Sequence, residues 1–98
     1  PLFFTDAQRV YVHAYVDPDL PLAAQDERTL LWRRYGDLDT GYGDRHVVHG
    51  HTPYPNGPRL YRHRTNLDCG AVFSGRLVIG VFDDAIPGGP LDLIEVNG

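Results

Sequence analysis

The sequence predicts a strand-rich α/β fold with one clear helix. Short apolar runs alternate with turns that contain glycine or proline, and one segment carries apolar residues at helical spacing. The composition, 42% apolar and 22% charged, is ordinary for a folded globular chain. With 98 residues, the chain forms one small domain or part of a larger one.

The predicted elements follow from these local patterns. A helix is predicted over 26–34, where acidic residues come first and Gly36 follows the last turn. Extended segments are predicted over 9–14, 46–49, 60–67, 76–82 and 91–96. Turns are predicted at Asp17-Pro18, 36–43, 55–58 and 86–90.

One helix of about three turns is too little to cover this many strands. Parallel sheets need helices on both faces. We therefore expect one of two arrangements: either a second half of the domain is missing from this chain, or the strands pack antiparallel as a sandwich.

Charge and cysteine content exclude several classes of protein. A net charge of −4 argues against non-specific binding to nucleic acid, and a single cysteine excludes an intrachain disulfide. No apolar run has the length of a membrane span and no signal segment opens the chain, so a cytoplasmic protein is expected. The start at Pro1 without any methionine predicts an N-terminus made by processing, by proteolysis or by design of the expressed segment.

Two histidines stand where predicted strands give way to turns. His13 follows the run Val-Tyr-Val, and His51 follows Val47-Val48-His49-Gly50. Ligands of open α/β folds bind at the carboxyl ends of strands, and a neutral imidazole is the commonest metal ligand. Because the two positions are far apart in sequence, they form no local ligand motif, and two hydrogen-bonded histidines at strand ends fit the pattern as well.

Three motifs occur in the order found in one enzyme family. The run VVHGHTP at 47–53 and the run NLDCGAVFSGRL at 66–77 are similar to the motifs V-x-G-H-T-P and N-x-D-T-G-A-V-x-G-G-x-L. The upstream run VYVHAYVDPDLPLAAQDERTLLWRR at 10–34 is similar to the segment H-A-G-x-x-P, an acidic helix and L-L-W-x-R. The chain therefore resembles the C-terminal half of a calcineurin-like metallophosphoesterase of the serine/threonine protein phosphatase type.

The resemblance implies roles for single residues. His13 matches the histidine of H-A-G and His51 that of G-H-T, and both are implied to bind the same one of two divalent metal ions. Arg34 matches the arginine of L-L-W-x-R, which is implied to contact the substrate phosphate; a guanidinium suits phosphate oxygens. Pro53 replaces the second histidine of many calcineurin-like phosphoesterases, which favours the serine/threonine-phosphatase branch.

The family's other metal ligands lie in upstream motifs that this sequence lacks, roughly G-D-x-H-G, G-D-x-x-D-R-G and G-N-H-[ED]. Residues 1–98 are therefore expected to be the C-terminal portion of a metallophosphoesterase domain, with the general acid in the missing half. In a two-metal site, the ions activate a water and hold the phosphate oxygens for in-line attack. Two imidazoles cannot do this, so we expect the chain alone to bind metal weakly and to be inactive.

The implied function of the parent protein is that of a metal-dependent phosphomonoesterase. Water attacks the phosphate ester of a phosphoprotein or of a small molecule, and manganese is the favoured metal, with iron or zinc as alternatives. A symmetrical diadenosine-tetraphosphate hydrolase is the alternative within the enzyme class. A non-catalytic remnant that serves as a binding or assembly module is the alternative from another class.

The resemblance also implies a fold and partners. The implied fold is a two-sheet α/β/β/α sandwich, of which this chain supplies mainly one sheet. Its uncovered apolar face is expected to pair with the missing N-terminal half or to self-associate. Neither nucleic acid nor a membrane is expected as a partner.

Two further residues are candidates for orienting a metal ligand. His49 shares strand parity with His51, although a solvent-facing or core-edge position is the alternative. Asp68 precedes the segment that matches T-G-A and is expected to hold the turn by local hydrogen bonds. Tyr15 and Cys69 stand where the family has Gly and Thr, and we interpret Cys69 as a small buried residue.

Two further residues, His63 and Trp32, stand out by their chemical type. His63 lies in the basic run 59–64, which either attracts a phosphorylated substrate or forms an exposed strand face. Trp32 is expected to anchor the core beneath the helix.

Overall fold

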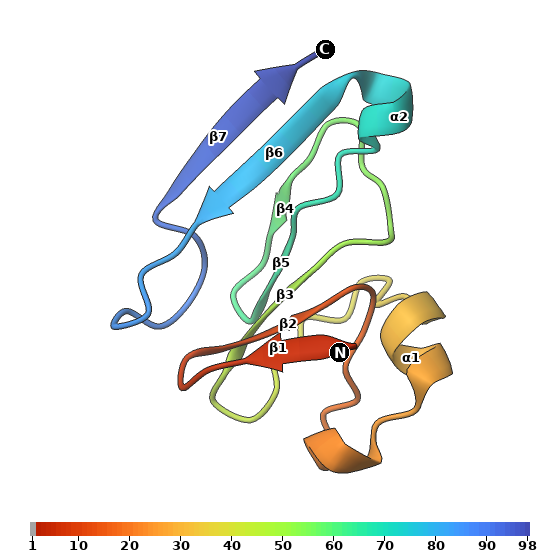
Figure 1. Ribbon diagram of the computed structural model, residues 1–98, viewed down its shortest axis with the longest axis vertical. Coiled ribbons are helices and arrows are strands. Elements are labelled where there is room, and N and C mark those ends of the chain that lie inside the picture. Colours follow the sequence, from red (N-terminus) through yellow and green to blue (C-terminus); the bar gives the residue numbers. More distant parts are fainter. Residues whose placement is uncertain (1) are drawn as a thin grey trace.

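The computed structural model describes residues 2–98, a strand-rich α/β arrangement with a mixed five-stranded sheet and a two-stranded hairpin (Figure 1). The larger sheet has the order β1-β2-β3-β5-β4. Its strands are β1 (Phe3–Thr5), β2 (Arg9–Val12), β3 (His46–His49), β4 (Arg59–Leu60) and β5 (Arg64–Asn66). The hairpin consists of β6 (Arg76–Val81) and β7 (Asp92–Asn97).

The three central strands of the larger sheet run parallel. Val10 of β2 lies opposite Val47 of β3, and Val48 of β3 lies opposite Thr65 of β5. β1 and β4 pair antiparallel at the two edges. The expected alternative of a purely antiparallel sandwich is therefore wrong, because the connection through the helix returns the chain in the same direction.

Only short helices accompany these strands: the 3-10 helix η1 (Leu22–Ala24), α1 (Glu27–Trp32) and α2 (Ala71–Ser74). The carboxylate of Asp26 caps α1 by accepting the backbone N–H of Arg28 at 2.9 Å. The helix is shorter than predicted because Arg33 is already extended. Within residues 2–98, no helix combines the length and the apolar character that crossing a membrane requires.

Most predicted strands are confirmed with slightly different ends. The segment 60–67 is interrupted, since β4 and β5 are separated by a turn at 61–63. β1, η1 and α2 were not predicted; the last of them is a single turn bounded by glycines in the left-handed region at residues 70 and 75.

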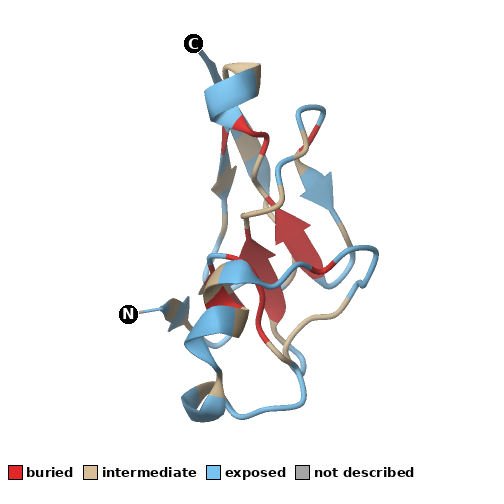
Figure 2. Cartoon of the chain, turned by 90° about the vertical axis from the view of Figure 1, so that its right-hand side faces the viewer, coloured by how far each residue is buried: buried red, intermediate tan, exposed pale blue. Residues whose placement is uncertain are grey.

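The core lies between the larger sheet and α1. Figure 2 shows that the buried residues concentrate on the central strands. Leu30 is the buried residue of α1, and its carbonyl accepts the N–H of Ala14 at 2.9 Å, which ties the helix to the end of β2. The cluster comprises Val10, Val12, Ala14, Tyr15, Val16, Leu30, Tyr35 and Val47.

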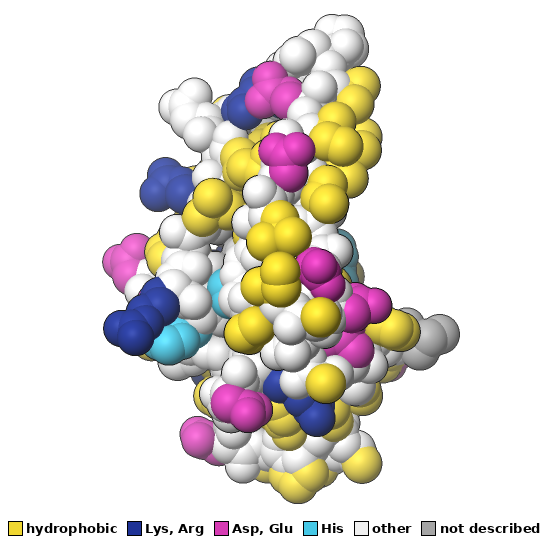
Figure 3. Space-filling model, turned by 90° about the vertical axis from the view of Figure 1, so that its left-hand side faces the viewer, with side chains coloured by type: hydrophobic (Ala, Val, Ile, Leu, Met, Phe, Trp, Pro, Cys, Tyr) yellow, Lys and Arg dark blue, Asp and Glu magenta, His cyan; other side chains and the backbone are white. Residues whose placement is uncertain are grey.

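The hairpin has one buried side and one uncovered apolar side. Val78 is buried. Leu77 pairs with Val96 across the strands and Ile79 pairs with Ile94, and all four side chains are about half exposed. Hydrophobic side chains accordingly gather over β6 and β7 on the surface in Figure 3. An aliphatic face of this kind is typical of a sheet that packs against another element.

Two arginines are buried and have no carboxylate partner within residues 2–98. Arg9, 0% exposed, donates from Nε to the Gly88 carbonyl at 2.9 Å and from Nη1 to the Asp83 carbonyl at 3.1 Å, and it also bonds the Ile86 carbonyl. Its guanidinium lies 4.7 Å from the Phe82 ring centroid. Arg9 is the first residue of β2. Its hydrogen bonds therefore attach the loop between β6 and β7 to the start of β2.

Arg64 fixes the loop after α1 in the same way. It is 2% exposed and donates to the Leu38 carbonyl at 2.6 Å and to the Gly36 carbonyl at 3.0 Å. The guanidinium is held between two aromatic rings, with centroids of Tyr35 and Tyr61 at 4.5 and 3.8 Å. The expectation that residues 59–64 form an exposed basic face is wrong for Arg64, although Arg62 and His63 are exposed.

We expect Arg64→Ala to lower the free energy of unfolding by roughly 2–4 kcal/mol, because buried acceptors lose their donor and a cavity replaces the side chain. Urea denaturation followed by circular dichroism measures this. Arg62→Ala is the matched control, since this exposed neighbour should change stability by less than about 0.5 kcal/mol. Equal effects of the two variants would contradict the assignment.

His46 predicts a pH dependence of stability. Its ring is buried, Nε2 lies 2.7 Å from the Thr65 hydroxyl, and burial lowers the pKa of His46 below its ordinary value of 6.5. Below that value the unfolded chain binds a proton that the folded chain does not, so stability falls as the pH drops from 7. His46→Gln should flatten this slope by up to about 1.4 kcal/mol per pH unit, whereas His63→Gln should not. Equal slopes for wild type and His46→Gln in urea titrations from pH 7.5 to pH 5 would refute the assignment.

Candidate metal and phosphate site

His13 and His51 meet at the carboxyl ends of two neighbouring parallel strands. β2 ends at Val12 and β3 ends at His49, so both histidines lie in the loops just beyond. The N–H of Gly50 donates to the His13 carbonyl at 2.8 Å and joins the two loops. The ring centroids of His13 and His51 are 5.1 Å apart. Their side chains come together although they are distant in sequence.

The backbone of His51 has an unusual conformation. Its φ angle is 72°, in the left-handed region that residues other than glycine rarely adopt. Such conformations persist where the surrounding structure enforces them, and they cluster at ligand sites. At His51, the Gly50 hydrogen bond on one side and Pro53 two residues later constrain the loop.

The two imidazoles fit a shared divalent cation. When two ring nitrogens lie about 2.1 Å from one ion, the ring centroids stand roughly 5 Å apart, which matches the separation seen here. Both rings line a cavity of about 330 Å³, together with Asp68, Cys69 and Arg76. Among residues 2–98, however, no group of three or more His, Cys, Asp or Glu side chains is arranged to hold a metal. Within these residues the two histidines thus have no third side chain of these types in position to complete a metal site.

His49 is buried and fully hydrogen-bonded. The Nη1 of Arg64 lies 2.9 Å from Nε2 of His49, and because a guanidinium is only a donor, Nε2 accepts. The proton is therefore on Nδ1, which donates to the Gly50 carbonyl at 3.1 Å. Burial lowers the pKa of His49 to about 4, so the ring stays neutral. The expectation of a solvent-facing position is wrong, since the residue is 5% exposed.

Asp68 forms the local turn bonds that were expected. Its Oδ1 accepts the N–H of Gly70 at 2.8 Å, and its own N–H donates to Oδ1 of Asn66 at 2.9 Å. The side chain also lies against Gly50, where an added Cβ would be 3.9 Å from Oδ2. Cys69 is a free, buried thiol, as predicted, and burial raises its pKa.

The arginines near the cavity differ in how far their charge is already engaged. Arg76 lines the cavity, but its guanidinium pairs with Glu95 at 2.6 Å and bonds the Gly57 carbonyl at 2.9 Å. Arg34 is exposed, and its guanidinium has no hydrogen-bond or carboxylate partner within residues 2–98. It does not line the cavity that holds the two histidines. Arg33, between Trp32 and Arg34, stacks over the Tyr15 ring at 4.4 Å.

Trp32 is on the surface, which corrects the expectation of a core anchor. It is 67% exposed because α1 is too short to turn more than Leu30 fully into the core. Its ring meets the His51 ring edge-on, with centroids 5.6 Å apart and planes at 89°. The sequence did not indicate this contact, since an apolar residue in a helix ordinarily predicts burial.

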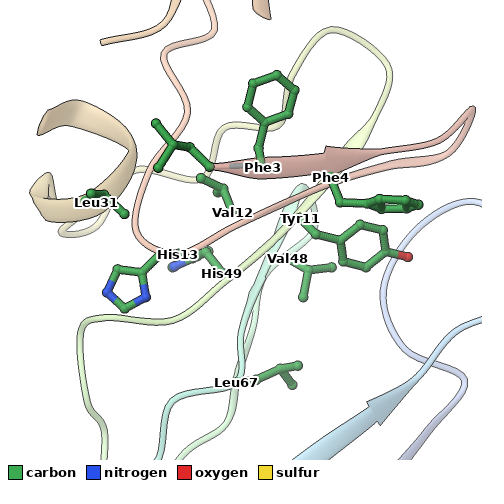
Figure 4. Close-up of a pocket in the computed structure, with 10 residues that line it drawn as sticks. Phe3, Phe4, Tyr11, Val12, His13, Leu31, Val48, His49 and Leu67 are labelled. Carbon is green, nitrogen blue, oxygen red and sulfur yellow. The ribbon is translucent and has the colours of Figure 1, made fainter. Parts of the chain in front are cut away.

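An apolar hollow of about 540 Å³ opens beside His13. Figure 4 shows His13 and Leu31 of α1 at one end of this hollow and Phe4 and Tyr11 at the other. Val48 and Leu67 also line it. The hollow is too apolar for a phosphate and indicates a surface that another element covers.

The chain is similar to hydrolases over part of their length. It is 33% identical over 98 aligned residues to "Bis(5'-nucleosyl)-tetraphosphatase PrpE (asymmetrical)" of Bacillus thuringiensis (strain Al Hakam), covering 79% of this chain and 38% of that protein. It is 51% identical over 82 residues to the protein of that name from Bacillus mycoides (strain KBAB4), covering 66% of this chain and 32% of that protein.

The protein of that name from Oceanobacillus iheyensis is 32% identical over 84 residues, which cover 69% of this chain and 33% of that protein. The chain thus spans about a third of the length of these relatives. No family model matches the sequence. No solved structure matches it either.

Proposed function

We propose that residues 1–98 are the C-terminal portion of a calcineurin-like metallophosphoesterase domain that hydrolyses phosphate esters or phosphoanhydrides at a two-metal site. The meeting of the His13 and His51 rings, 5.1 Å apart beyond adjacent parallel strands, is the observation that carries the proposal. The motifs around both histidines and the partial similarity to tetraphosphatases support it independently.

The site residues take distinct roles in this proposal. His13 and His51 bind one divalent ion through neutral imidazoles, and manganese, iron or zinc suits nitrogen ligands. The bound ions supply charge that stabilises the transition state and an activated water for in-line attack. The free guanidinium of Arg34 grips the phosphate oxygens. His49 and Asp68 hold the Gly50–His51 segment in position.

The similarity favours a dinucleoside polyphosphate as substrate. The relatives are named as asymmetrical bis(5'-nucleosyl)-tetraphosphatases, so the proposed reaction divides a dinucleoside tetraphosphate into unequal products. Symmetrical cleavage of the same substrate is the nearest variant. Dephosphorylation of phosphoproteins is the second candidate, which the VVHGHTP and NLDCGAVFSGRL motifs favour.

The uncovered surfaces support a domain that is larger than these residues. The aliphatic face of the hairpin and the hollow beside Tyr11 and Val48 both lack a cover among residues 2–98. In a two-sheet sandwich, an opposing sheet would bury them. In our proposal the remaining part of the domain covers these surfaces and brings the other metal ligands and the general acid.

Titration of the chain with Mn²⁺ tests the metal site. We expect weak binding that broadens the NMR signals of the His13 and His51 rings first, because a paramagnetic ion acts on its ligands most strongly. His13→Ala and His51→Ala should each weaken binding by about tenfold or more, since even loss of an outer hydrogen-bond partner costs that much. His63→Ala, which removes an exposed histidine, is the control. Unchanged binding after either site substitution would refute the assignment.

Product analysis tests the reaction. The chain alone, supplied with Mn²⁺ and diadenosine tetraphosphate, should release no nucleotide above the uncatalysed rate, because two imidazoles do not complete the site. The protein that carries the proposed N-terminal half should release AMP and ATP, whereas ADP alone would indicate symmetrical cleavage. Release of phosphate only from a phosphopeptide would support the second candidate. Turnover by the chain alone that His51→Ala abolishes would contradict the proposed incomplete site.

A further inference from the structure

The high solvent exposure of the Trp32 side chain is unusual for a tryptophan. Tryptophan is a residue that folding usually buries, yet this one ends α1 with two thirds of its surface in solvent. The indole contacts the His51 ring edge-on, with the two planes at 89°. The indole therefore stands beside the proposed metal site with its surface available.

Two cavities in the protein surface are lined in part by the indole of Trp32. A cavity of about 410 Å³ is lined by Glu27, Arg28, Leu31 and Trp32, and one of about 330 Å³ by Asp26, Arg28, Thr29, Trp32 and Arg33. Trp32 and Arg28 are common to both. These volumes lie in the range of small-ligand sites.

The chemistry of this surface suits a flat heterocycle. Nucleobases stack on aromatic side chains and on guanidinium planes whatever their sequence, because every base has a π-face. Carboxylates beside the indole, such as Glu27, accept hydrogen bonds from exocyclic amino groups. The free guanidinium of Arg34, two residues further along the chain, and the His13–His51 pair provide for the phosphates of the same ligand.

We propose that Trp32 is a stacking platform for a nucleobase of the substrate and so strengthens the binding of nucleotides. This inference rests on the proposed function, since it places the phosphates at His13, His51 and Arg34. It adds to that function the residue that recognises the non-reacting part of the substrate. Trp32 acts by binding and takes no part in bond breaking.

The sequence provides a direct probe, since Trp32 is the only tryptophan in the chain. Its indole N–H gives a single NMR signal that reports on ligands without any catalysis. In the presence of Mg²⁺, adenosine and ADP should shift this signal upfield, as stacking does, whereas pyrophosphate should not. Trp32→Ala should weaken ADP binding about tenfold while leaving pyrophosphate binding unchanged, and Trp32→Phe should retain part of the affinity.

Phe73→Ala is the matched control. Phe73 is 87% exposed and lies on α2, away from α1 (Figure 1), so its removal should change binding of neither ligand. If pyrophosphate and ADP shift the indole signal equally, or if Trp32→Ala binds ADP as well as wild type, the platform is refuted. If adenosine shifts the signal but pyrophosphate does not bind even to the protein that carries the proposed N-terminal half, the platform holds and the phosphate site of the proposed function fails. Absence of binding by either ligand to that protein refutes both.

Discussion

Two buried guanidiniums, which have no carboxylate partner in the part of the chain that the structure describes, impose the conditions on which the rest of this fold depends. An arginine cannot shed its proton inside a protein, so its charge must be compensated by hydrogen bonds and polarizable neighbours. Arg9 and Arg64 obtain that compensation from backbone carbonyls and aromatic rings. Burial of each arginine therefore requires the loop that supplies its carbonyl acceptors to be in its native position. This requirement couples segments that are distant in sequence.

The same constraint reaches the candidate site through one hydrogen-bonded chain. Arg64 donates to His49, His49 donates to the Gly50 carbonyl, and the Gly50 N–H donates to the His13 carbonyl. The loop that carries His51 is therefore bonded on one side to a buried charge and on the other to the loop of His13. Hydrogen bonds of this kind fix the two loops relative to each other, and so preorganise the positions of His13 and His51. The strained backbone at His51 is sustained by the same network.

Local signals in the sequence were sufficient to predict that His13 and His51 each follow a strand. Alternating apolar runs end at a proline or glycine in each case, and the ends of strands follow from neighbours in sequence. The burial of His49 was not predictable in this way, because it depends on the side chain of Arg64 from another strand. The predicted burial of Trp32 was wrong for a related reason. Residue type predicts burial only if the helix is long enough to present that face to the core. The parallel pairing of the central strands is likewise a long-range property. The residue pattern of a short strand does not predict which strand it pairs with or in which direction.

The exposed apolar surfaces of the molecule differ in chemistry, and the difference decides what each can bind. The strip of Leu77, Ile79, Ile94 and Val96 is aliphatic and regular, and the face it forms suits another sheet. Trp32 is a single aromatic ring flanked by charged side chains, beside two imidazoles and near an uncommitted guanidinium. An aliphatic strip offers no group that orients a small polar ligand, whereas the surroundings of Trp32 offer stacking, hydrogen bonding and charge together. Charged side chains are rare in buried cores, yet acidic residues and arginines line both cavities beside Trp32. In our proposals, this difference is why the hairpin face packs against the rest of the domain and the end of α1 recognises a ligand.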